Sequence, residues 1–194
     1  MKYQASSPDE LALVDGASVL GYKFVNRSSN TLNIQIWNNE PQTWITHVEF
    51  PFDSSRKRMS VITEYKNKYY LMTKGADSIM LPRCNVIEEN RNIMQGHLDK
   101  FAREGLRTLV MGQKEISQRE FDDFMKEYET IKVSTDKHKE KKLVRLYDEL
   151  EMNLELLGAS AIEDKLQKGV PETIYKLMEA DIRIWVLTGD KQVH

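Results

Sequence analysis

Hydrophobic and polar residues alternate along four stretches of the chain, and this period of two predicts β-strands. The stretches cover residues 31–37, 44–50, 58–65 and 68–73, with the turn-forming pairs Asn38-Asn39 and Lys66-Asn67 between strands. Alternation leaves one face of each strand polar, so we expect an antiparallel meander with one solvated face. Within 58–65 the pattern predicts Met59 and Val61 as core residues.

Helical spacing of apolar residues appears on both sides of this meander. Ser7-Pro8-Asp9-Glu10 is typical of a helix start, in which Ser7 caps the helix and Glu10 completes a capping box. Ser117 and Glu120 form a second such signature. Further helices are expected over 77–81, 88–104 and 143–150, with another strand over 106–113. The predicted fold class is α+β, an antiparallel sheet flanked by helices.

The last forty residues show a different pattern. An apolar strand over 154–162, a helix over 170–180 and a second apolar strand over 182–187 make a βαβ unit, which implies a parallel sheet. We therefore expect two parts, a domain over residues 1–152 and a βαβ fragment of a second, parallel α/β domain over 153–194. Without sheet neighbours, the two tail strands would be displaced or would pair between molecules.

Composition and missing motifs argue against several classes of function. The 28 basic and 30 acidic residues give a net charge of -2, which argues against nucleic acid as a partner. Cys84 is the only cysteine, so no disulfide framework is possible. The sequence has no apolar run long enough to span a membrane, no secretory signal and no Walker-type phosphate loop. The scattered histidines predict no metal site.

Two residues near strand ends suggest contact with a nucleotide. Phe52 could stack on a purine, although its position alone favours an ordinary core aromatic. Lys74 precedes Gly75, whose lack of a side chain lets a ligand approach the backbone. Between them lies the cationic run Arg56-Lys57-Arg58. Three adjacent cations are costly to bury, so at least one should face solvent or an anion.

Two further charged residues have two interpretations each. Arg107 could bind a phosphate through its planar guanidinium, or form a surface ion pair with Glu104 or Asp99. Glu10 could accept a hydrogen bond from an adenine amino group, although its position in the capping signature favours the cap.

The expected C-terminal strands both end in acidic groups. Thr188-Gly189-Asp190 follows the second strand, and Asp190 could hold magnesium or its waters. Asp164 follows the first strand, so both carboxylates could face one crevice.

Several blocks together resemble one family, the P-type ATPases, and within it the phospholipid-flipping class. The blocks are YQASSPDELALV (3–14), PFDSSRKRMSVI (51–62), KGAD (74–77), EGLRTLV (104–110), LLGASAIEDKLQKGVPETI (156–174) and IWVLTGDK (184–191). They follow the family order along nearly the whole chain, which makes the joint match far more specific than any block alone.

The resemblance assigns roles to the candidate residues. It implies that Phe52 stacks on adenine, Lys74 lies at the base of the nucleotide pocket and Arg107 reaches toward the phosphates. It places Glu10 at the adenine end, against the local preference for a cap. It also implies that Asp164 is a hinge-side acid near the nucleotide. Thr188, Gly189 and Asp190 would approach the phosphoryl group and its magnesium.

The resemblance also implies what surrounds this chain. The cofactors would be ATP and Mg²⁺, and the partners ATP or ADP and the remaining domains of a parent ATPase at the cytosolic face of a membrane. Phospholipid would be a substrate of the parent alone. The blocks with the phosphorylated aspartate are missing, so we expect no catalytic residue here and binding without turnover. The fragment should be monomeric or weakly self-associating through its tail.

Two other functions stay open. One is the nucleotide-binding domain of a cation pump, although the SPDE motif and the run Asp164-Lys165-Leu166-Gln167 argue against it. The other is a non-catalytic interaction module, in which the aromatic residues are core and Lys74 is a surface lysine.

Overall fold

The structure, a computed structural model, describes residues 3–5, 7–165 and 167–187. Its strands are β1 (Tyr22–Ser28), β2 (Thr31–Ile36), β3 (Gln42–Asp53), β4 (Arg58–Tyr65), β5 (Lys68–Gly75), β6 (Arg107–Ile116) and β7 (Glu155–Ile162). Its helices are α1 (Pro8–Val19), α2 (Asp77–Met80), α3 (Glu88–Arg103), α4 (Gln118–Val133), α5 (Lys139–Leu150) and α6 (Val170–Glu179), with a 3₁₀ turn at Leu81–Arg83.

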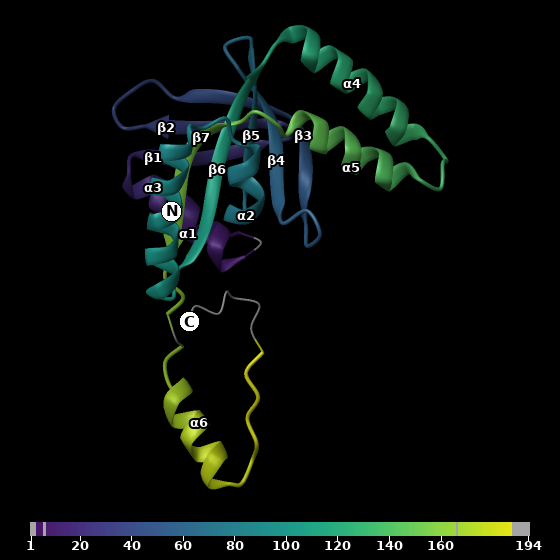
Figure 1. Ribbon diagram of the computed structural model, residues 1–194. Helices are drawn as coiled ribbons and strands as arrows, with labels where there is room; N and C mark the ends of the chain where they lie inside the picture. Colours follow the sequence, from purple (N-terminus) through teal and green to yellow (C-terminus); the bar gives the residue numbers. More distant parts are fainter. Residues whose placement is uncertain (1–2, 6, 166, 188–194) are drawn as a thin grey trace.

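All seven strands form one sheet, in the order in which they occur along the chain. Every neighbouring pair is antiparallel, which confirms the predicted meander and the α+β class. Helix α1 packs against both β1 and β7, so the two edge strands of this curled sheet lie near the same helix. Helices α4 and α5 pack side by side and project together from one end of the sheet (Figure 1).

The α4–α5 pair covers one face of the sheet. Phe50 of β3 is completely buried and stacks on Tyr147 of α5, with ring centroids 4.0 Å apart. Phe124 of α4 lies 5.5 Å from the same phenylalanine ring. Other fully buried side chains on the central strands are Ile62, Leu71 and Val110. These contacts anchor the end of α5 against the strand that carries Phe52.

The prediction that Met59 and Val61 belong to the core is wrong. On β4 the buried positions are Arg58, Ser60, Ile62 and Thr63, so the face with Arg58, Ser60 and Ile62 is the one turned inward. Polar residues occupy a buried face here because their hydrogen-bonding groups find partners there. Met59 and Val61 lie on the other face, where they line a shallow apolar groove.

The expected βαβ unit differs from the structure. Strand β7 pairs antiparallel with β6 along its length, from Arg107 opposite Ile162 to Gln113 opposite Glu155. The edge of β6 offers a row of backbone donors and acceptors, and β7 satisfies them within the same sheet. Residues 182–187 are not a strand. The division at residue 152 stays a prediction, but the strand expected to open the second part completes the first sheet.

The segment after β7 stands apart from the sheet. Helix α6 forms where the sequence predicted it, yet none of its residues is buried, and it lies below the sheet in the view of Figure 1. Trp185 and Leu187 are 83% and 93% exposed. Self-association through this tail stays a prediction. Among the described residues, no helix has the length and apolarity needed to cross a membrane.

Candidate nucleotide site

Phe52 lies near the end of β3 and points out of the core. Its side chain is 64% exposed, whereas Phe50, two residues earlier, is fully buried. The core-aromatic interpretation is therefore excluded by the structure. An exposed benzyl ring on an ordered strand presents a face on which a flat heterocycle can stack.

Lys74 and Glu10 are brought together by the fold. Lys74 is the penultimate residue of β5, and its ammonium Nζ lies 2.6 Å from each carboxylate oxygen of Glu10. Both side chains are partly exposed, at 22% and 33% respectively. Ser7 caps α1 by accepting a hydrogen bond from the backbone N–H of Glu10, but the Glu10 carboxylate turns to Lys74. The capping box expected here is therefore only half formed.

Arg107 is the first residue of β6 and forms ion pairs with two carboxylates. Its Nη1 lies 3.2 Å from Asp9 Oδ1, and its Nη2 lies 2.6 Å from Asp164 Oδ2. These partners come from the start of α1 and from the segment after β7, rather than from the nearby acids that the sequence suggested. The Arg107 side chain is 41% exposed, so an anion from solvent can approach it.

The adjacent residues Asp9 and Glu10 thus reach two different cations. Together with Asp164, they place three carboxylates against Lys74 and Arg107. Beside Arg107 lies an open hollow with a volume of about 370 Å³. Its lining includes Asp9, Ala76, Asp77, Leu106 and Arg107. The arrangement offers cations to an incoming phosphate, but only in exchange for carboxylates already in contact with them.

Phe52 stands apart from these charged groups. In the sheet register, Asp53 lies opposite Arg58 and Met59 lies opposite Lys74, so β4 separates the strand of Phe52 from that of Lys74. Two strand spacings amount to roughly 10 Å. An adenosine placed with its base on Phe52 can therefore direct its phosphates toward the other side of β4. Phe52 and Lys74 do not line the hollow beside Arg107.

The predicted site residues Thr188, Gly189 and Asp190 lie outside the described residues. Within the described part of the chain, no group of three or more His, Cys, Asp or Glu side chains is placed to hold a metal ion. Asp164, the other acid expected near a crevice, instead contacts Arg107.

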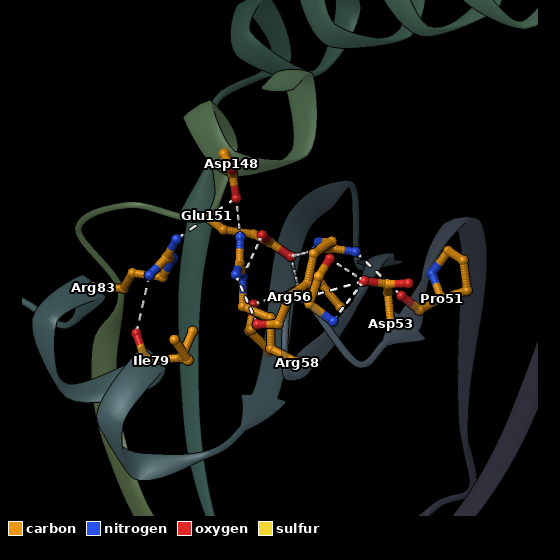
Figure 2. A network of polar contacts seen from close by, with 11 residues as sticks. Pro51, Asp53, Arg56, Arg58, Ile79, Arg83, Asp148 and Glu151 are labelled. Carbon is orange, nitrogen blue, oxygen red and sulfur yellow. Dashed lines mark hydrogen bonds and ion pairs between the residues drawn. The ribbon is translucent and has the colours of Figure 1, made fainter. Parts of the chain in front are cut away.

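Sequence reasoning expected at least one residue of the cationic run to face solvent or an anion, and Lys57 is exposed, but it did not identify the anion. Arg56 and Arg58 are only 5% and 2% exposed, and both donate to the carboxylate of Glu151, which is completely buried. Figure 2 shows this network between the β3–β4 hairpin and the end of α5. Glu151 lies 93 positions along the chain from Arg58, so no local pattern connects them.

Comparison with known proteins identifies the family to which the chain is similar. A family model described as P-type ATPase, cytoplasmic domain N, matches residues 2–169. The chain is 44% identical over 193 residues to Phospholipid-transporting ATPase IC of Homo sapiens, an alignment that covers 99% of this chain and 15% of that protein. It is 43% identical over 197 residues to Phospholipid-transporting ATPase DRS2 of Saccharomyces cerevisiae, covering 99% of this chain and 14% of that protein.

The chain spans about 15% of the length of these relatives. The family model nevertheless covers most of the chain, including α1, the complete sheet and the five residues Glu10, Phe52, Lys74, Arg107 and Asp164. The chain therefore belongs to the P-type ATPase family, in which it corresponds to cytoplasmic domain N.

Proposed function

We propose that this domain binds ATP or ADP with the adenine ring against Phe52 and the phosphates directed toward Lys74 and Arg107. The observation that carries the proposal is the exposed Phe52 at the end of the sheet where Lys74 and Glu10 meet. Lys74 and Arg107 supply positive charge for the phosphates, and Glu10, whose carboxylate pairs with Lys74, lies at the same end of the nucleotide. Asp164 leaves Arg107 as a phosphate approaches.

The parent protein is proposed to be a phospholipid-transporting P-type ATPase at the cytosolic face of a membrane. The names of the relatives support this substrate class, and no finding favours a cation pump or a non-catalytic module. In the parent, this domain would deliver ATP to a catalytic aspartate on another domain, and phosphoryl transfer would drive lipid movement. Positioning supplies most of the catalysis in such transfers, so the isolated domain should bind nucleotide without turnover.

Magnesium is proposed to arrive with the nucleotide phosphates. Bound there, Mg²⁺ would neutralise phosphate charge during transfer. Thr188, Gly189 and Asp190 remain the proposed contacts to the phosphoryl group and its Mg²⁺.

Titration of the domain with ADP, followed by calorimetry, tests the site. Phe52→Ala should weaken binding about 5- to 150-fold, because stacking of a base on an aromatic ring contributes about 1–3 kcal/mol. Lys74→Ala should weaken ADP binding more than adenosine binding, because its charge acts on phosphate.

Two exposed residues away from the site supply matched controls. Tyr175→Ala removes a 62% exposed aromatic on α6, and Lys68→Ala removes a lysine at the opposite end of β5. Both variants should bind ADP as the unmodified protein does. Unchanged affinity in both Phe52→Ala and Lys74→Ala would overturn the assignment of the site.

A further inference from the structure

The network around Glu151 is the most completely buried set of charges among the described residues. The Glu151 carboxylate accepts from Arg56 Nη2, from Arg58 Nε at 2.7 Å and from Ser60 Oγ at 2.5 Å. Arg58 also donates to Asp148, which lies one turn earlier on α5. Glu151 follows the last residue of α5, where the helix dipole favours nearby cations.

The network forms hydrogen bonds with the chain on both sides of Phe52. Arg56 Nη1 donates to the carbonyl oxygen of Pro51 at 3.1 Å. Asp53 Oδ1 accepts from the backbone N–H groups of Ser55 and Arg56, at 2.8 and 3.2 Å. The residues before and after Phe52 are therefore both tied to Arg56, whose guanidinium is fixed by Glu151 (Figure 2).

The same network reaches the strand that carries Lys74. Arg58 lies opposite Gly75 in the sheet, and the backbone N–H of Ala76 donates to the carbonyl oxygen of Lys57 at 3.0 Å. Contact is so close that a Cβ atom on Gly75 would lie 2.6 Å from Arg58 Cβ. The position of Arg58 therefore fixes the end of β5 just beyond Lys74.

We infer that Glu151 is a positioning residue for the nucleotide site, although it lies on the buried side of the sheet. Through Arg56 it fixes the backbone that presents Phe52, and through Arg58 it fixes the end of β5 that presents Lys74. It thereby sets the separation between the adenine platform and the phosphate-facing ammonium group. This inference rests on the proposed nucleotide site.

Energetics favour a geometric role for these charges over a purely stabilising one. Burying ions costs free energy of desolvation, and well-packed apolar residues in place of a buried ion pair often give equal or greater stability. An ion network with directional hydrogen bonds from two guanidinium groups specifies one arrangement of the three segments that it joins. Fixed alignment of Phe52 before binding avoids an entropic cost of ordering the hairpin when the nucleotide arrives.

A double-mutant cycle on the full chain tests this role, with ADP as the ligand. The cycle compares the unmodified protein, Glu151→Gln, Phe52→Ala and the double variant. Glu151→Gln should weaken ADP binding about tenfold, within the range of couplings between residues of one network. In the Phe52→Ala background the same change should weaken ADP binding clearly less, because the ring that Glu151 positions is absent and only its effect on Lys74 remains.

Glu149→Gln is the matched control, since Glu149 lies on α5 two residues before Glu151, is 59% exposed and pairs with the exposed Arg145. It should leave ADP affinity unchanged. Amide hydrogen exchange of residues 51–58 should rise in Glu151→Gln and not in Glu149→Gln. If Glu151→Gln fails to fold, Asp148→Asn provides a milder test, because Asp148 is 44% exposed and pairs with Arg58 and Arg83 at the edge of the network.

The outcomes separate this inference from the proposed function. Suppose that Phe52→Ala weakens ADP binding, while the folded Glu151→Gln or Asp148→Asn variant keeps full affinity. This result would overturn the positioning role alone. Fully additive losses in the cycle would also overturn it, because they indicate independent effects. Absence of ADP binding by the unmodified protein would overturn both.

Discussion

Adjacent acidic residues at the start of α1 neutralise two cations of the proposed site. Glu10 contacts Lys74, while Asp9 contacts Arg107. Local sequence favoured Glu10 as a helix cap because a spacing of three residues is visible in the sequence, whereas Lys74 lies 64 positions away. The resemblance to a family placed both residues at the nucleotide, and the structure brings them together, but their contact with nucleotide stays a prediction.

At the scale of single residues we expect Asp9→Asn to strengthen ATP binding about 1.4- to fivefold. Asp9 occupies Arg107 and would repel an incoming phosphate, and partly exposed ion pairs of this kind contribute about 0.2–1 kcal/mol. Calorimetric titration with ATP measures the change. Asp15→Asn, an exposed acid on the same helix, should have no such effect. Equal or weaker binding by Asp9→Asn would show that this carboxylate does not compete with phosphate.

Among the elements, the β3–β4 hairpin joins the surface site to the core. The strand predicted over 58–65 coincides with β4, because its alternation is strong, but the choice of buried face was wrong. Alternation identifies two faces without saying which one is buried, and apolar Met59 and Val61 suggested the wrong one. Strand β1 was missed altogether, since it lies at the sheet edge and most of its residues are exposed.

Helix signals were more reliable than the choice of strand face. The capping box at Ser117 and Glu120 forms in full and begins α4, because all its hydrogen bonds are local. Glu151 carried no comparable signal. Its partners Arg56 and Arg58 belong to a hairpin that lies 95 and 93 positions earlier in the sequence, so only the tertiary structure reveals the pairing.

At the scale of this hairpin we expect a dependence on pH through Asp53. Hydrogen bonds from the Ser55 hydroxyl, and then from the Ser55 and Arg56 backbone N–H groups, lower the pKa of Asp53 below its ordinary value of 3.8. The ionised carboxylate is favoured in the folded hairpin. Its stabilising contribution is therefore present above pH 3.8 and is lost as the pH falls through the lower folded-state pKa.

Amide hydrogen exchange of residues 53–57 between pH 5 and pH 2.5, roughly the range over which an aspartate titrates, measures this effect. After correction for intrinsic rates, local opening should increase toward the acidic end. In Asp53→Asn the same residues should open at a level nearly independent of pH. Equal pH dependence in both proteins would assign the effect to other carboxylates.

In the whole molecule, a seven-stranded sheet carries Phe52, Lys74 and Arg107, while Glu10 lies on α1 and Asp164 just after β7. Helix α6 of the tail adds no buried side chain to the core. The division predicted from sequence placed 154–162 outside the first domain because its continuous apolar character is typical of a parallel strand. That character also suits an antiparallel strand packed beside helices α1 and α3, which is what the structure shows. Local pattern alone does not distinguish the two pairings.

Removal of residues 166–194 should leave the sheet folded with nearly unchanged thermal stability. Helix α6 contributes no buried residue, and the tail exposes Trp185, Val186 and Leu187. The shortened chain should also self-associate less, because these apolar groups are removed. Thermal melting and analytical ultracentrifugation of the two chains provide the comparison. A large loss of stability would show that the tail contributes to the packed domain.

Arg107 joins two distant parts of the chain. Asp9 precedes the first strand and Asp164 follows the last, yet both carboxylates meet at this one guanidinium. Arg107 thus links the segment through which the chain enters the domain to the segment through which it leaves. We expect a phosphate bound to Arg107 to weaken both ion pairs. Nucleotide binding would then let the domain rotate relative to the chain segments that enter and leave it.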